Sequence, residues 1–370
     1  MKHPAWTTAL QSEWFLGLSL GTCVVFFFAG DALFAHLRNP FFWTIIFLWL
    51  FSAILGSALC VVRHAEGLAE RLGEPYGTLI LTLSVTSIEV MSITAVMLHG
   101  DNNPTLARDT MFAVVMIVLN GMVGLSLLLG ALRHREQHYN LQGANIYLSV
   151  IIPLAVMAMI LPDYTKTTAG PTLSATQQGF LVFASISLYC AFLAVQTGRH
   201  KGYFAIEGEA VAPEHHGKPQ PNILFHSVLL LAYMLPVVFL AEQLAHPVDH
   251  VIETLRMPAA IGGIIIAVIV ATPEAIGAVH AARVNHMQRS VNIFLGSVLS
   301  TIGLTVPGII IVSRITGHEI ILGVQNADFM MLILTLAVAV VTFASGRTNV
   351  LQGAVHLLLF ATYCLLIFQN

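Results

Sequence analysis

The sequence predicts an all-α polytopic membrane protein of about eleven transmembrane helices, organised as one extra N-terminal helix and two inverted five-helix repeats. Hydrophobic residues make up 56% of the 370 positions and charged residues 9%, whereas soluble domains have about 45–50% and 25%. The apolar residues form long stretches, and a weak internal repeat relates the two halves of the chain. Together these observations predict repeated bundles of membrane helices.

The lengths of the apolar stretches predict the individual helices. A hydrocarbon core of about 30 Å requires roughly 17–25 apolar residues per helix. Eleven stretches fit, at residues 14–36, 41–62, 77–98, 110–131, 144–162, 174–197, 223–243, 259–280, 291–313, 328–345 and 350–368. We expect the first to be a retained helix and not a signal peptide, because no clear small-x-small cleavage site follows it.

The internal repeat appears when the chain is shifted by 185 residues. This offset places Gly77 on Gly262, Val85 on Val270 and Glu89 on Glu274. Five helices per repeat is an odd number, so the second repeat enters the membrane from the opposite side, as in many secondary transporters. The expected organisation is an extra helix at 1–40, a first repeat at 41–197, a cytoplasmic linker at 198–222 and a second, inverted repeat at 223–370.

The distribution of Lys and Arg predicts the topology, because positive residues are retained on the cytoplasmic side. Eleven of the 16 lie on the side of the N-terminus and five on the other. The larger group is Lys2, Arg63, Arg71, Arg133, Arg135, Arg199, Lys201, Lys218, Arg283, Arg289 and Arg347. We therefore expect a cytoplasmic N-terminus and an outside C-terminus.

Several classes of function are disfavoured. The basic residues are scattered and the formal net charge is -3, so no surface for nucleic acid is expected. The four cysteines lie in apolar stretches at unrelated spacings and indicate neither a disulfide framework nor a zinc site. No zinc-protease, nucleophile-elbow or Walker motif occurs, which disfavours an intramembrane protease or an ATP-driven pump, and we expect no cofactor. The sequence carries no signal for an oligomeric state.

Two carboxylates lie near the middle of predicted helices and are related by the repeat. A charge at the bilayer centre costs at least about 2.5–3.5 kcal/mol, so such residues are functional candidates. Glu89 lies in the third helix and Glu274 in the eighth. If they approach each other across the pseudo-twofold axis, they would bind a cation or protons in competition.

Oxygen-bearing side chains surround these acids in sequence. Pro273 has no N–H, which frees the carbonyl of Ile269 and should kink the helix. Possible further ligands are Thr86, Ser87, Thr272, Asn120, Asn292, Ser297, Ser300 and Thr301. Hard cations such as Ca²⁺ or Na⁺ prefer oxygen ligands. Ser, Thr and Asn also bridge membrane helices, so both roles stay open for these residues.

Short motifs carry a family resemblance over nearly the whole chain. They are Gly73-Glu74-Pro75-Tyr76-Gly77, Ile88-Glu89-Val90, Pro273-Glu274, Gln288-Arg289 with Asn292, Gly296-Ser297-Val298-Leu299 and Ser345-Gly346-Arg347-Thr348-Asn349-Val350. On these residues the chain resembles the calcium/cation antiporter superfamily, in the branch of Cax-type cation/proton exchangers.

The resemblance implies eleven helices, two inverted acidic repeats and a place in the bacterial inner membrane. It implies exchange of the inorganic cations Ca²⁺, Na⁺ or K⁺ for protons, with Glu89 and Glu274 as the transport glutamates. The chain departs from the family pattern where Gly-Asn is usual, because it has Val85-Thr86 and Val270-Ala271. With fewer side-chain oxygens, we expect a weaker preference for Ca²⁺ over monovalent ions.

The expected function is cation export against proton entry by alternating access in the lipid bilayer. A cation channel with the same acidic lining is one alternative, and it predicts conductance without obligatory proton exchange. A membrane-embedded, metal-dependent lipid enzyme is another, although the loops lack an acidic or Cys/His cluster beside a plausible active site.

Overall fold

The helices of the structure correspond one to one with the predicted membrane spans. The structure is a computed structural model and describes residues 13–73, 76–98, 103–168, 170–205, 222–324 and 326–369. Within these ranges ten helices are long and apolar enough to cross a membrane, and Ala327–Phe343 is a shorter apolar helix. The same ranges contain no β-strand. The predicted all-α polytopic fold is therefore confirmed.

The chain divides into two compact units. Unit 1 comprises residues 1–99 and 210–256, and unit 2 comprises residues 100–209 and 257–370. Each unit therefore takes helices from both predicted repeats. Glu89 belongs to unit 1 and Glu274 to unit 2.

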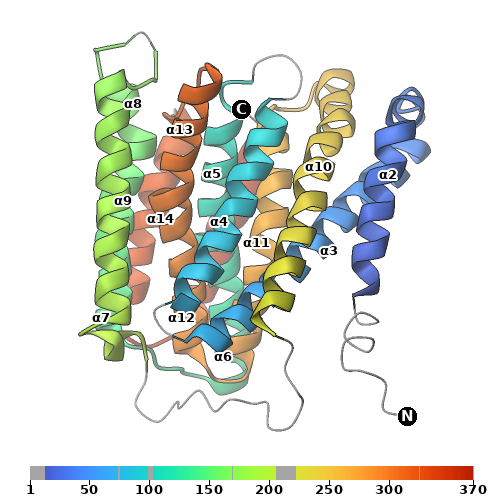
Figure 1. Cartoon of the computed structure of the whole chain (residues 1–370). Helices are drawn as coiled ribbons and strands as arrows, with labels where there is room; N and C mark the ends of the chain where they lie inside the picture. Colours follow the sequence, from blue (N-terminus) through green and yellow to red (C-terminus); the bar gives the residue numbers. More distant parts are fainter. Residues whose placement is uncertain are drawn as a thin grey trace, which may run out of the picture. The chain divides into compact units, whose positions relative to one another are not determined.

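Unit 1 is built around two long helices. Its helices are α2 (Trp14–Phe34), α3 (Pro40–Leu72), α4 (Tyr76–Met97) and α10 (Ile223–Leu255). The helix α10 packs along α3 and also contacts α2 and α4 (Figure 1). The helix α3 begins at Pro40, where the Asn39 side chain accepts a hydrogen bond from the backbone N–H of Phe41.

The ends of α3 and α10 correct two predicted boundaries. The helix α3 continues to Leu72 instead of residue 62, and α10 continues to Leu255 instead of residue 243. Hydropathy alone predicts both helix ends too early, because the last turns are amphipathic and contain charged residues that lower the hydropathy but still favour helix. Each helix stops where the backbone takes positive φ, at Gly73 (65°) and at Arg256 (52°). Arg63 and Arg71 thus lie on α3 and not in a loop.

The helices α3 and α10 run antiparallel and are joined near both ends. The indole N–H of Trp43 donates to the carbonyl of Pro247 at 2.7 Å. At the other end, the Nδ1 atoms of His64 and His226 are 3.0 Å apart. Trp43 and His64 are separated by about 30 Å along the helix at 1.5 Å per residue, which is the thickness of a hydrocarbon core.

Unit 2 contains the remaining helices and three π-helical segments. They are α5 (Leu106–Met116), η1 (Ile117–Met122), α6 (Val123–His134), α7 (Leu141–Ala155), η2 (Val156–Ile160), α8 (Leu161–Tyr164), α9 (Ala175–Thr197), η3 (Lys201–Phe204, a 3₁₀ turn), α11 (Ala260–Arg283), α12 (Met287–Ser300), η4 (Thr301–Thr305), α13 (Val306–Thr316), α14 (Asn326–Phe343) and α15 (Val350–Ile367). The spans containing η1 and η4 are the most buried of the ten. π-Helical turns occur frequently at functional sites.

Glycines let pairs of unit 2 helices approach closely. A Cβ atom on Gly263 of α11 would lie 2.6 Å from the backbone nitrogen of Thr110 on α5. One on Gly353 of α15 would lie 2.6 Å from the backbone nitrogen of Leu128 on α6. Small residues commonly allow such contacts between membrane helices.

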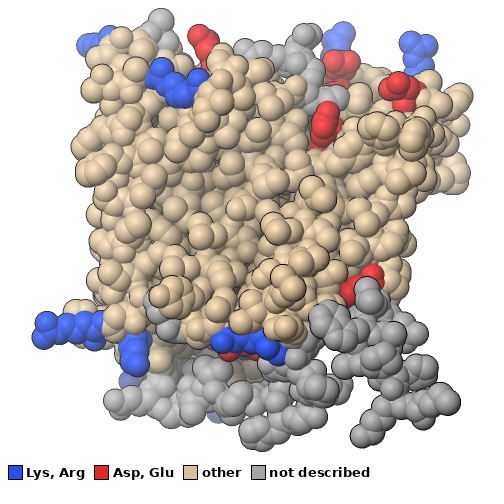
Figure 2. Space-filling view, viewed as in Figure 1, with Lys and Arg blue, Asp and Glu red and all other residues tan. Residues whose placement is uncertain are grey.

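On one face of the protein the visible charged side chains lie near the helix ends. On the face drawn in Figure 2, the Lys, Arg, Asp and Glu side chains lie close to the two ends of the helices, and the stretch between is uncharged. Part of the predicted linker, residues 206–221, lies outside the described residues, as do Lys2, Lys218 and the motif residues Glu74 and Pro75.

Substituting Gly353 tests the α6–α15 contact. Because the new Cβ would meet backbone atoms, we expect Gly353→Ala to lower the free energy of unfolding by about 1–3 kcal/mol. Gly179→Ala on α9 is the matched control, since its Cβ would meet nothing within 4 Å. Thermal unfolding in detergent would compare the two, and equal stability of both variants would argue against the close crossing.

Candidate functional site

Glu89 is buried on α4 and has two hydroxyl groups on the same helix face. Its exposed fraction is 2%, and Thr86 and Ser92 lie three residues to either side. The hydroxyl oxygens of Thr86 and Ser92 are buried without a hydrogen-bond partner among the described residues. Ser87 is half-buried. A buried hydroxyl without a partner costs free energy, so this face fits a ligand that would bind oxygen.

Ser92 is a candidate that the sequence interpretation missed. The sequence pattern named only Thr86 and Ser87, which precede Glu89. A helix also places residue 92 on the same face as residue 89. The i, i+3 spacing would have identified it.

Glu274 lies on α11 and is partly buried. The hydroxyl of Ser297, on the neighbouring α12, donates a hydrogen bond to its Oε2 atom. Glu274 and Ser297 are therefore brought together, as expected for two members of one site. A donor to the carboxylate stabilises its charged form in an apolar span.

Pro273 lies inside α11 without ending it. The helix continues from Ala260 to Arg283, and Pro273 cannot donate to the carbonyl of the buried Ile269. The hydroxyl of Thr272 donates to the carbonyl of Val268 in the preceding turn, so this hydroxyl is engaged within its own helix.

Ser300 and Thr301 follow Ser297 where α12 passes into η4. The Ser300 hydroxyl donates to the carbonyl of Ser297 at 2.9 Å, and both residues are 5% exposed. Thr301 is the first residue of η4 and is also buried. The change from α to π geometry thus begins four residues, about one helical turn, after Ser297, the residue that binds Glu274.

The two asparagines are engaged in contacts between segments of unit 2. Asn292 donates to the carbonyl of Phe204 at 2.8 Å and accepts from the side chain of Gln288 at 2.9 Å. This links α12 to the turn η3. Both polar atoms of the Asn292 side-chain amide are therefore engaged in packing contacts, one of the two roles that the sequence left open.

Asn120, on η1, belongs to a buried polar network with α14 and α15. Its amide donates to the hydroxyl of Thr335 at 2.8 Å. Its carbonyl oxygen lies 3.3 Å from Nδ1 of His356, while Nε2 of His356 lies 2.9 Å from the hydroxyl of Thr342. A neutral histidine protonated at Nδ1 satisfies both contacts, with Thr342 donating to Nε2. Asn120 and His356 thereby hold the π-helical turn in place.

The comparisons with known proteins identify the family. The model of the sodium/calcium exchanger protein family matches residues 42–198 and 225–369. The chain belongs to this family.

Two relatives and one solved structure extend this result. The putative ionic transporter y4hA of Sinorhizobium fredii is 42% identical over 324 residues, covering 87% of this chain and 88% of the relative. The sodium-potassium/proton antiporter ChaA of Escherichia coli is 39% identical over 319 residues, covering 85% and 86%. The Ca²⁺/H⁺ antiporter protein YfkE has the same fold, with a TM-score of 0.72 at 20% identity over 97% of this chain and 100% of that chain.

Family membership makes the chain a ChaA-like member of the calcium/cation antiporter superfamily and a transporter, not an enzyme. The resemblance found in the sequence motifs is confirmed. The chain is a multi-pass membrane protein, similar to bacterial inner-membrane antiporters.

Replacing His356 tests whether its network stabilises η1. In His356→Leu, the buried Asn120 oxygen and the Thr342 hydroxyl lose a partner, and we expect about 1–3 kcal/mol of destabilisation. His138→Leu is the control, because His138 is exposed. Thermal unfolding of the two purified variants measures the difference, and a fully stable His356→Leu would contradict the structural role.

Proposed function

We propose that the chain is a secondary active antiporter that exports Ca²⁺, Na⁺ or K⁺ in exchange for protons by alternating access. The observation that carries this proposal is a buried glutamate in an apolar span, Glu89, flanked by the buried hydroxyls of Thr86 and Ser92 that have no partner among the described residues. The name of the Escherichia coli relative, a sodium-potassium/proton antiporter, supports the class of substrates.

Each glutamate is proposed to bind either a cation or a proton. A carboxylate that is empty and charged is costly inside the membrane, whereas a bound proton or cation compensates its negative charge. Only the loaded forms then pass between the inward-open and outward-open states at an appreciable rate. Competition for the same oxygens couples the two fluxes.

The proposed ligands beside Glu89 are Thr86, Ser87 and Ser92. Those beside Glu274 are Ser297, Ser300 and Thr301, with the carbonyl of Ile269 as a backbone ligand. The Ser297 hydroxyl can turn its donor away from Glu274 and offer its oxygen lone pairs when a cation binds. The cation is the transported substrate, and the proposal requires no resident cofactor.

The proposed inverted repeats are supported by the lengths and irregularities of the helices. The helices α3 and α10 each have 33 residues, and each begins one repeat. The offset of 185 residues places η1 on residues 302–307, which overlap η4 at Thr301–Thr305. Both repeats thus interrupt the corresponding span at the corresponding depth.

The proposed orientation follows from the Lys and Arg distribution, with the N-terminus in the cytoplasm and the C-terminus outside. In a bacterial inner membrane the proton gradient drives protons inward and cations outward. Each tenfold proton gradient supplies about 1.4 kcal/mol per proton. A potential of 100 mV supplies about 2.3 kcal/mol per charge moved.

Replacing the two glutamates tests the proposed site. In inside-out vesicles with an acid interior, we expect CaCl₂, NaCl or KCl to dissipate the pH gradient. Glu89→Gln and Glu274→Gln should each slow this response by at least about tenfold, equivalent to ~1.4 kcal/mol, because an amide keeps the shape but cannot bind a proton or compensate a cation's charge. The fluorescence of a pH-sensitive dye measures the gradient.

Glu253→Gln is the matched control, since Glu253 is exposed at the end of α10. Full activity in either site variant would remove that glutamate from the mechanism, and conductance without proton movement would favour a channel. The relative responses also test selectivity, because strictly Ca²⁺-dependent exchange would contradict the expected weak preference for Ca²⁺.

Ser92→Ala tests the ligand that the structure adds. Losing one oxygen ligand should weaken apparent cation affinity by roughly 2–10-fold, the equivalent of about 0.5–1.5 kcal/mol. Ser84→Ala on the same helix is the control, because the Ser84 hydroxyl donates to the carbonyl of Ile80 at 2.7 Å. Cation titrations in the same vesicle assay compare the half-saturating concentrations, and identical values for both variants would exclude Ser92 as a ligand.

A further inference from the structure

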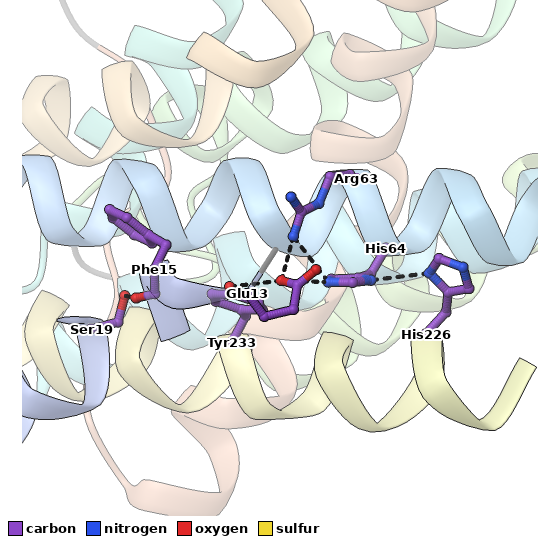
Figure 3. A network of polar contacts seen from close by, with 7 residues as sticks. All are labelled: Glu13, Phe15, Ser19, Arg63, His64, His226 and Tyr233. Atoms are coloured by element: carbon purple, nitrogen blue, oxygen red, sulfur yellow. Dashed lines mark hydrogen bonds and ion pairs between the residues drawn. The ribbon is translucent and has the colours of Figure 1, made fainter. Parts of the chain in front are cut away.

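A cluster of polar side chains joins three segments of unit 1 and includes neither Glu89 nor Glu274. Its centre is Glu13, the residue before α2, which is buried (Figure 3). Its Oε2 atom accepts hydrogen bonds from Arg63 of α3 and from the hydroxyl of Tyr233 on α10, the latter at 2.9 Å. Nε2 of His64 lies 3.4 Å from the same oxygen.

The cluster continues through His64 to His226. The Nδ1 atoms of the two rings face each other at 3.0 Å (Figure 3). At this distance one nitrogen must donate and the other must accept, so only one proton fits between them. His64 is 2% exposed, whereas His226 is half-buried at the start of α10.

Gly67 provides the space for the His226 ring. A Cβ atom at position 67 would lie 2.7 Å from Cε1 of His226 and 2.9 Å from its Nδ1. The His226 ring therefore lies directly against the backbone of α3 at Gly67, and this close contact places the ring beside His64.

The proton count of the pair decides whether the contact survives. In the closed pair one proton lies between the two Nδ1 atoms, donated by whichever ring carries it. Nε2 of His64 lies 3.3 Å from the Arg63 guanidinium as well as near Glu13, so either ring can be the donor. Once both Nδ1 atoms are protonated, two N–H groups face each other and at least one ring is positively charged, so the hydrogen bond is lost.

The charges around the pair include both signs. Arg63 and Arg71 on α3 lie near the rings, and so do Glu13 and Glu70. Tyr233 and Cys60 also lie at the Glu13 end of the cluster. Although burial opposes it, the Tyr233 hydrogen bond and the Arg63 and His64 charges hold the pKa of Glu13 below its ordinary value. Glu13 therefore stays ionised, and its contribution is lost only when the pH falls through that lowered pKa.

We propose that the His64–His226 contact is a proton-operated latch between α3 and α10, which is closed while one proton lies between the two Nδ1 atoms and opens when both Nδ1 atoms are protonated. The latch acts at one end of the helix pair only. The Trp43–Pro247 hydrogen bond at the other end contains no group that titrates in this range. Acid therefore separates the histidine ends of α3 and α10 while their other ends stay joined. This gives the transporter a response to pH that is separate from proton binding at Glu89 or Glu274.

Distances between spin labels test the latch without requiring transport activity. The native cysteines Cys23, Cys60, Cys190 and Cys364 are replaced by alanine, and labels are attached at Leu72→Cys and Leu224→Cys, which are exposed at the histidine end. In detergent micelles we expect this distance to increase as the pH falls from about 8 to 4, through and below the ordinary histidine range.

Two variants and one control pair sharpen the result. In His226→Gln the side chain cannot take up a proton, so the distance should not depend on pH. In Gly67→Ala the displaced ring should give the longer distance at every pH. Labels at Phe41→Cys and Leu255→Cys, both exposed at the other end, should report a constant distance. A pH-independent Leu72–Leu224 distance in the parent protein, or an unchanged response in His226→Gln, would overturn the proposal.

Discussion

The cost of placing a carboxylate in a hydrocarbon medium governs how this protein is built. Charged residues are few and lie mostly near helix ends, so a buried glutamate needs a compensating environment. Glu274 has the Ser297 hydroxyl, and Glu89 has two neighbouring hydroxyls on its helix face. Glu13, just before the first described helix, has donors from α3 and α10. Each acid thus lies beside groups that donate hydrogen bonds to it, or beside oxygen atoms that could bind a cation together with it.

Much of the fold could be predicted because hydrocarbon thickness imposes a minimum length on apolar stretches. That constraint located all eleven spans. It says little about where a helix ends in water, which is why the amphipathic ends of α3 and α10 were predicted too short. The π-helical turns were also missed. They depend on packing around residues such as Asn120, whose partners Thr335 and His356 lie more than 200 positions away in the sequence.

The candidate site shows the same division between local and distant information. Glu89 and Glu274 were selected because a charge in an apolar stretch is visible in the sequence. Ser92 was accessible by helical spacing alone. The packing role of Asn292 could not be predicted from the sequence, because its partner is the backbone carbonyl of Phe204 and every residue has a carbonyl. Sequence patterns identify which groups are costly to bury, whereas only the structure shows which of them already have hydrogen-bond partners.

The position of Glu13 changes how the extra N-terminal helix is understood. A helix outside the two proposed repeats looks dispensable, since neither candidate transport glutamate lies on it. Yet the residue immediately before α2 supplies the counter-ion for Arg63 and the acceptor for Tyr233. The segment before the extra helix thus delivers a negative charge to the point where Arg63 and His64 of α3 meet Tyr233 of α10. Removing or displacing it would leave a guanidinium and a buried imidazole without their anion, so the segment is an electrostatic part of unit 1.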